Sequence, residues 1–205
     1  MNDLTSVALG LRLLAVATAA FSLLPIIAWL AGATPAVEAL RAMREPGDAM
    51  QVVMVVMMVV AIGSWLVGLG AVLRGFGEGP PSPRILLLVL AIVAQLAAVS
   101  VFSCIGDGLD SDVRKATPMI ICVGGFMLVL PSLAFAALRW PWLRRPKTMA
   151  SGLLLGTFAL LPWGLTATRL VDLPLSTVAT TSALTIAFVV PTLERCARDA
   201  AKVRQ

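Results

Sequence analysis

The sequence contains no histidine and no tyrosine, and only 13% of its 205 residues are charged. Without imidazole, the chain has no side chain that ligates haem in the usual way or acts as a general base near neutral pH. Its three cysteines include no C-x-x-C pair, which argues against thiol oxidoreduction by that motif. These absences exclude haem-dependent and histidine-dependent chemistry.

Apolar residues dominate what is present. They make up 59% of the chain, and the mean hydropathy is +0.95, whereas soluble domains are about 45–50% apolar and about 25% charged. Six spans of roughly 20 residues each would use nearly all of the hydrophobic residues and leave no room for a soluble domain. We therefore expect one integral membrane domain over residues 1–205. A soluble enzyme, a nucleic-acid-binding domain and a disordered tail are excluded.

The distribution of the apolar residues predicts an all-α transmembrane bundle. Windows of about 19 residues define six candidate spans, at 13–31, 50–73, 85–105, 118–138, 149–168 and 174–193. The fifth span contains several glycines and the sixth contains many serines and threonines. An arrangement with five spans therefore stays open.

The basic residues are distributed unevenly between the predicted loops. If the spans alternate in direction, eleven of the sixteen Lys and Arg residues fall on one side, which the positive-inside rule assigns to the cytoplasm. Both termini are then cytoplasmic, in a bacterial inner membrane crossed several times. Topology and contact with anionic lipid explain the net charge of +5, so the expected partner is the lipid bilayer and not nucleic acid. The cytoplasmic cations are Arg12, Arg74, Arg84, Arg139, Arg144, Arg145, Lys147, Arg195, Arg198, Lys202 and Arg204.

The first span has a second interpretation. Arg12, the apolar run that follows it and the small residues 31–33 resemble a signal peptide with its cleavage site. The apolar region of a signal peptide has about 7–15 residues, whereas residues 13–31 form a run of 19. We therefore expect this segment to be retained as a span.

Small residues predict where helices approach closely. Gly152 and Gly156 form a G-x-x-x-G pair in the fifth span, and Ser64 and Gly68 repeat that spacing in the second. Such pairs allow close packing of membrane helices, and the partner helix belongs to this chain or to another one. Gln95, the one large polar residue well inside a span, is expected to hydrogen-bond a neighbouring helix, with contact to a ligand as the alternative.

Four spans contain a proline, which removes a backbone donor and is expected to kink the helix. Kinked helices frame substrate sites near the membrane midplane in transporters, and ordinary kinked packing is the alternative. The sixth span also carries Thr177, Thr181 and Thr185 four residues apart, whose hydroxyls either bond to a carbonyl one turn back or line a pathway. The prolines are Pro25, Pro131, Pro162 and Pro191.

Sulfur-containing residues allow one metal hypothesis. Thioethers and thiols bind Cu(I), and the candidate ligands are expected toward the outer leaflet, although methionine is also an ordinary packing residue. The two outer cysteines form a disulfide in the alternative reading. These candidates are Met50, Met54, Met58, Cys104 and Cys122.

Tryptophans fit the predicted spans. Trp29 and Trp163 are expected toward the outer boundary of the membrane, and Trp140 and Trp142 at the cytoplasmic boundary, where aromatic residues form belts. Trp65 lies deeper in its span and is expected to pack between helices.

Function is the least determined property. No Asp, Glu, Lys or Arg lies in the middle of any span, which argues against ion-coupled transport. The loops are short and show no catalytic constellation, so we expect no cofactor and a non-enzymatic accessory or assembly subunit with a membrane protein partner. The alternative is a small-molecule transport component, since size and topology alone resemble the substrate-binding subunits of vitamin-uptake transporters. Cu(I) handling and a lipid enzyme using the acidic stretch 107–112 with a metal are further alternatives.

Overall fold

The computed structural model describes residues 3–30, 49–74, 129–138, 140–167 and 173–202. These residues form α1 (Asp3–Leu30), α3 (Ala49–Arg74), α6 (Pro146–Ala167) and α7 (Leu175–Lys202), and residues 129–137 are helical as well. No strand occurs within these ranges. The predicted all-helical class is confirmed for this part of the chain.

Two of the described helices, Leu4–Leu30 and Leu175–Lys202, are long and apolar enough to cross a membrane. The bounds of α3 match the predicted 50–73 within one residue, but α1 begins before residue 13 and α7 continues past residue 193. Hydropathy windows record only the apolar part of a helix, while residues 194–202 are mostly good helix formers that extend the backbone hydrogen bonding. The predicted span at 85–105 and most of 118–138 lie outside the described residues.

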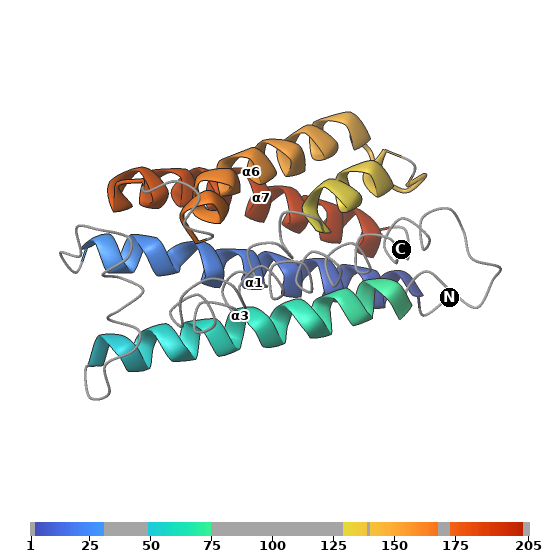
Figure 1. Ribbon diagram of the computed structural model, residues 1–205. Coiled ribbons are helices and arrows are strands. Elements are labelled where there is room, and N and C mark those ends of the chain that lie inside the picture. Colours follow the sequence, from blue (N-terminus) through green and yellow to red (C-terminus); the bar gives the residue numbers. More distant parts are fainter. Residues whose placement is uncertain (1–2, 31–48, 75–128, 139, 168–172, 203–205) are drawn as a thin grey trace, which may run out of the picture.

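Helix α1 lies at the centre of the described bundle (Figure 1). It packs against α3 on one side and α7 on the other, and α6 packs against α7. Neighbouring helices run antiparallel, and the two chain termini lie at the same end. Helix α1 contributes buried side chains along its whole length, including Val7, Leu11, Leu14, Phe21 and Leu24.

Glycines mark two places where helix backbones come close together. A Cβ on Gly10 of α1 would lie 2.6 Å from the carbonyl oxygen of Gly68 on α3. On α6, a Cβ on Gly152 would lie 2.5 Å from Oγ1 of Thr192, and a Cβ on Gly156 would overlap Val189. Both crossings therefore depend on residues without a side chain.

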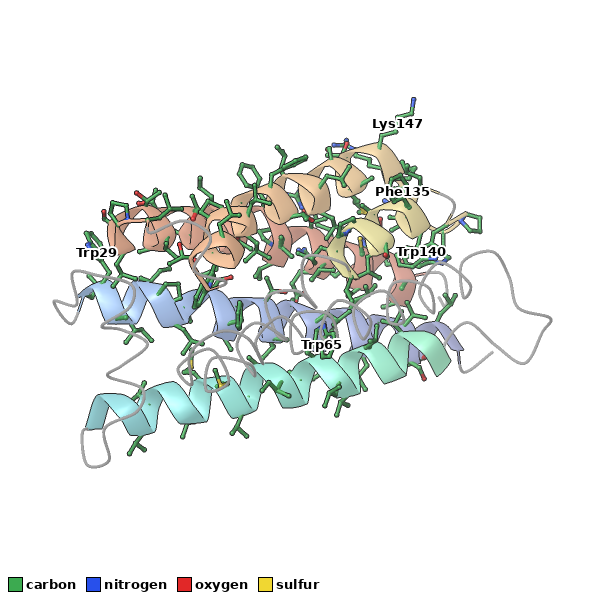
Figure 2. All side chains as sticks on the ribbon, viewed as in Figure 1. Trp29, Trp65, Phe135, Trp140 and Lys147 are labelled. Carbon is green, nitrogen blue, oxygen red and sulfur yellow. The ribbon has the colours of Figure 1, made fainter. Side chains whose placement is uncertain are left out.

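Two of the tryptophans lie at opposite ends of the bundle, and a third packs against another helix. Trp29 is 48% exposed at one end of the bundle, and Trp140 lies at the opposite end (Figure 2). Trp163, expected toward the outer membrane boundary, is only 4% exposed and stacks on Phe21 of α1 with 5.6 Å between ring centroids. Stacked aromatic rings stabilise a helix contact, so this pair joins α6 to α1, and the boundary positions of the tryptophans stay a prediction.

Candidate functional site

The buried polar side-chain atoms without a hydrogen-bond partner in the described part of the chain include three that come from α1, α6 and α7. These three are the hydroxyls of Ser22 on α1 and Ser182 on α7, and the indole Nε1 of Trp163 on α6. Both serines are fully buried. A buried hydroxyl without a partner destabilises a protein by about 1–3 kcal/mol, so three such groups require an explanation. We call them the polar layer.

The members of the polar layer come from three helices at one level of the bundle. Helices α6 and α7 are antiparallel and in register where Gly156 faces Val189. Seven residues onward along α6 is Trp163, and seven residues back along α7 is Ser182, so these two lie at the same height. Phe21, the chain neighbour of Ser22, stacks on Trp163 and sets α1 at that height too.

The surrounding threonines differ from these serines. Thr18, Thr166 and Thr185 are buried, and each donates its hydroxyl to the carbonyl one turn back, at 2.8–3.0 Å. Thr181 bonds in the same way to the carbonyl of Thr177 at 3.0 Å. The sequence allowed the hydroxyls of residues 181 and 185 either to bond to a carbonyl of their own helix or to line a pathway. In the structure they bond to their own helix.

Two of the predicted prolines border the polar layer. Pro25 follows Ser22 by three residues on α1, and Pro162 precedes Trp163 on α6. Pro25 has no N–H, so it cannot form the usual helical hydrogen bond to the residue four positions earlier. The layer itself consists of two hydroxyl groups and one indole N–H donor. Because it contains no titratable group among the described residues, it is suited to hydrogen bonding and not to acid–base chemistry.

The remaining predicted packing residues are placed as follows. Gly152 and Gly156 face α7 of the same chain, and Gly68 faces Gly10 of α1. Ser64 is half-buried on α3. Pro191 lies inside α7, and Pro131 lies within the helical residues 129–137. Gln95 is outside the described residues.

The candidate copper ligands are only partly described. Met50, Met54 and Met58 lie on α3, where Met58 packs against the core. Cys104 and Cys122 are outside the described residues. Cys196 is free and buried, with its Sγ 3.3 Å from Sδ of Met149. In the described ranges, no group of three or more His, Cys, Asp or Glu side chains could hold a metal ion.

Sequence reasoning missed three contributors. Gly10 precedes the first predicted span, and Ser22 and Trp163 are single residues inside apolar runs. Gly10 could have been noticed from the sequence, because a small residue in a helix allows a second helix to approach closely. Nothing in the linear pattern distinguishes Ser22 from the threonines that satisfy themselves.

A second feature is the basic end, where the chain termini, Trp140 and Lys147 lie (Figures 1 and 2). Glu194 and Asp199 lie at this end and are half-buried, whereas seven of its cations are exposed. The backbone N–H of Arg144 donates to Oδ2 of Asp199 at 3.3 Å. The exposed cations are Arg12, Arg144, Arg145, Lys147, Arg195, Arg198 and Lys202.

Comparison with known proteins gives no match: no family model, no curated protein and no solved structure resembles this chain significantly.

Proposed function

We propose that the chain is a multi-pass integral protein of a bacterial inner membrane that works as an accessory or assembly subunit of a membrane complex. The observation that carries this proposal is a charge-free slab shared by the four long helices that the structure describes. In α1 the slab extends from Arg12 to Leu30, which at 1.5 Å per residue is about 27 Å. The hydrocarbon core of a bilayer is about 30 Å thick.

The other helices have matching charge-free stretches. Neither α3 before Arg74, nor α6 after Lys147, nor α7 before Glu194 contains an Asp, Glu, Lys or Arg. Large apolar side chains point outward within this slab, among them Val59 at 65% exposed, Phe158 at 70% and Leu184 at 45%. In water these faces would form extended apolar patches of the kind that soluble monomers avoid. Lipid or a partner helix would cover them.

The subunit role is supported by what the slab offers chemically. Within the described helices it contains no charged group for proton or ion relay. Its G-x-x-x-G face is used between α6 and α7, so it is not open to a second chain. A protein with this interior acts through its outer faces, which is how an accessory subunit contacts a partner.

We expect a second protein to co-purify at fixed stoichiometry when the tagged chain is extracted from its native host into lipid nanodiscs. The measurement is quantitative mass spectrometry of the purified discs, with a tagged, unrelated multi-pass protein from the same host as the control. Recovery of the chain alone would contradict the subunit role.

A second candidate, a small-molecule transport component, is favoured by the depth of the polar layer. Ser22 lies ten residues, or about 15 Å, from Arg12, which is close to the middle of the slab. Hydrogen-bonding groups beside proline-interrupted helices at the midplane are typical of substrate sites in transporters. A small hydrogen-bonding molecule without charge would suit these donors.

For purified protein free of ligand, we expect Ser182→Ala to raise the free energy of unfolding by about 1–2 kcal/mol, because it removes a buried hydroxyl without a partner. Thr185→Val is the matched control on the same helix, since the Thr185 hydroxyl is bonded to Thr181 and its removal should not stabilise. Chemical denaturation in detergent measures both.

The transport role has its own test. If it holds, a small molecule that the wild type retains through purification is lost from the Ser182→Ala variant. A Ser182→Ala variant that is destabilised and still retains that molecule as well as the wild type would argue against a site in the polar layer.

A further inference from the structure

Cations from two separate segments meet at the basic end. Arg195, Arg198 and Lys202 are spaced by three and four residues and share the exposed face of α7. Arg144, Arg145 and Lys147 lie in the turn before α6 and at its first residues. The bond from the Arg144 N–H to Asp199, together with the contact between Cys196 and Met149, holds this turn against the last turns of α7.

The turn before α6 is held in place by buried side chains. Leu143 is 7% exposed and Trp140 only 2%, and Trp140 stacks on Trp142 with 4.7 Å between ring centroids. The burial of these side chains fixes the direction in which Arg144 and Arg145 leave the turn. A surface with this anchoring keeps its charges close together in the absence of a ligand.

On the two described segments that form this surface, the cations outnumber the carboxylates. Six cations face two carboxylates, and the structure shows no ion pair between them among the residues it describes. Asp199 is engaged by the Arg144 backbone, and Arg198 donates through Nε to the backbone carbonyl of Glu194 at 3.4 Å. Like charges held together repel each other, so the surface favours an external anion.

The start of α6 adds backbone donors to the same place. The helix begins at Pro146, which has no N–H, and the N–H of Met149 bonds to the carbonyl of Arg145 at 3.1 Å. The N–H groups of Lys147 and Thr148 belong to the first turn, which has no intrahelical acceptors. Together with the positive end of the helix dipole, they favour a phosphate beside Arg145 and Lys147.

The outer face of α6 changes from polar to apolar with depth. Thr148, Ser151, Leu155 and Phe158 are exposed and spaced by three or four residues, so they form one stripe along the helix. The polar half begins at the basic end, and the apolar half lies within the charge-free slab. A lipid has the same polarity gradient, with a phosphate above its acyl chains.

We propose that one part of the basic end, between the start of α6 and the last turns of α7, binds the phosphate headgroup of an anionic phospholipid, with the acyl chains along the outer stripe of α6. This site rests on the proposed membrane location. It differs from general attraction to a charged membrane surface, which would depend on net charge and not on particular residues.

The test compares two charge reversals in nanodiscs that contain phosphatidylglycerol and phosphatidylcholine in equal amounts. Arg145→Glu changes the proposed site, and Arg12→Glu makes the same change on α1, outside both segments. An acidic residue next to a helix N-terminus does not disfavour the helix, so Arg145→Glu is expected to fold. We expect the ratio of phosphatidylglycerol to phosphatidylcholine retained after transfer to detergent to fall about tenfold for Arg145→Glu and less than twofold for Arg12→Glu, measured by native mass spectrometry.

Three outcomes would overturn the site. Equal effects of the two reversals would indicate only general surface attraction, an unchanged ratio would indicate no anion site, and displacement of the lipid by millimolar inorganic phosphate would indicate a soluble phosphate ligand. Washing the membranes with alkaline carbonate tests the location separately. A chain released by carbonate would refute the membrane proposal, whereas a chain that stays in the membrane without lipid preference would refute only the headgroup site.

Discussion

Gly10→Ala is expected to lower the free energy of unfolding by about 2–3 kcal/mol, a large effect for one methyl group. The added Cβ would lie 2.6 Å from the Gly68 carbonyl oxygen and 2.7 Å from the Val72 backbone nitrogen. Because both atoms belong to the backbone of α3, no side-chain rotation relieves the contact, and the two helices must separate. Overpacking of this kind typically destabilises by about 1–3 kcal/mol.

Gly70→Ala is the matched control for this prediction. Gly70 is exposed on α3, and within the described residues nothing lies within 4 Å of a Cβ placed there. Both substitutions gain about 1 kcal/mol of helix propensity, so the difference between them reports the contact between α1 and α3. Thermal and chemical unfolding in detergent measure it. Equal stability of the two variants would show that the helices do not cross at Gly10.

The same contact bears on the signal-peptide interpretation of the first span. Helix α1 lies between α3 and α7 and supplies Phe21 to the stack with Trp163. Cleavage after residue 33 would remove the centre of the bundle, including Gly10 and Ser22. A destabilising effect of Gly10→Ala in the mature protein therefore also requires that the segment be retained.

Sequence reasoning predicted the helical class and the position of α3 because both depend on long apolar runs, which a hydropathy window detects directly. The predicted spans are shorter than helices α1 and α7, because the extra turns contain Arg12 or Glu194 and Arg195, which end an apolar window without ending a helix. The apolar slab and the helical extent are thus two different lengths. The cations at the slab boundary lie within the helices but outside the apolar slab.

The candidate sites show a sharper limit of sequence reasoning. Gly152 and Gly156 are recognisable from their spacing, but the identity of their partner is a property of three-dimensional register. The polar layer has no regular spacing along the sequence, since its three members come from three different helices. Only the antiparallel pairing of α6 with α7 and the stacking of Phe21 on Trp163 bring them to one level.

The crossing of α6 and α7 provides the second large effect. Gly156→Ala would place its Cβ on the Cγ2 atom of Val189, which is fully buried, and we expect a loss of about 2 kcal/mol or more. Val189→Ala alone should destabilise by a similar amount because it leaves a cavity. In the double variant the new methyl group occupies space that Val189 vacates, so the total loss is expected to be smaller than the sum by about 1–2 kcal/mol.

Gly152→Ala combined with Val189→Ala is the control, because a Cβ on Gly152 meets Thr192 and not Val189. We expect the control pair to be additive in the same unfolding experiment. If the G-x-x-x-G face joined two copies of the chain instead, Gly156→Ala would change the oligomeric state, and Val189→Ala would give no rescue within one chain. Rescue confined to Gly156 and Val189 would therefore assign the motif to the interior of the bundle and leave the outer apolar faces for lipid and for the partner.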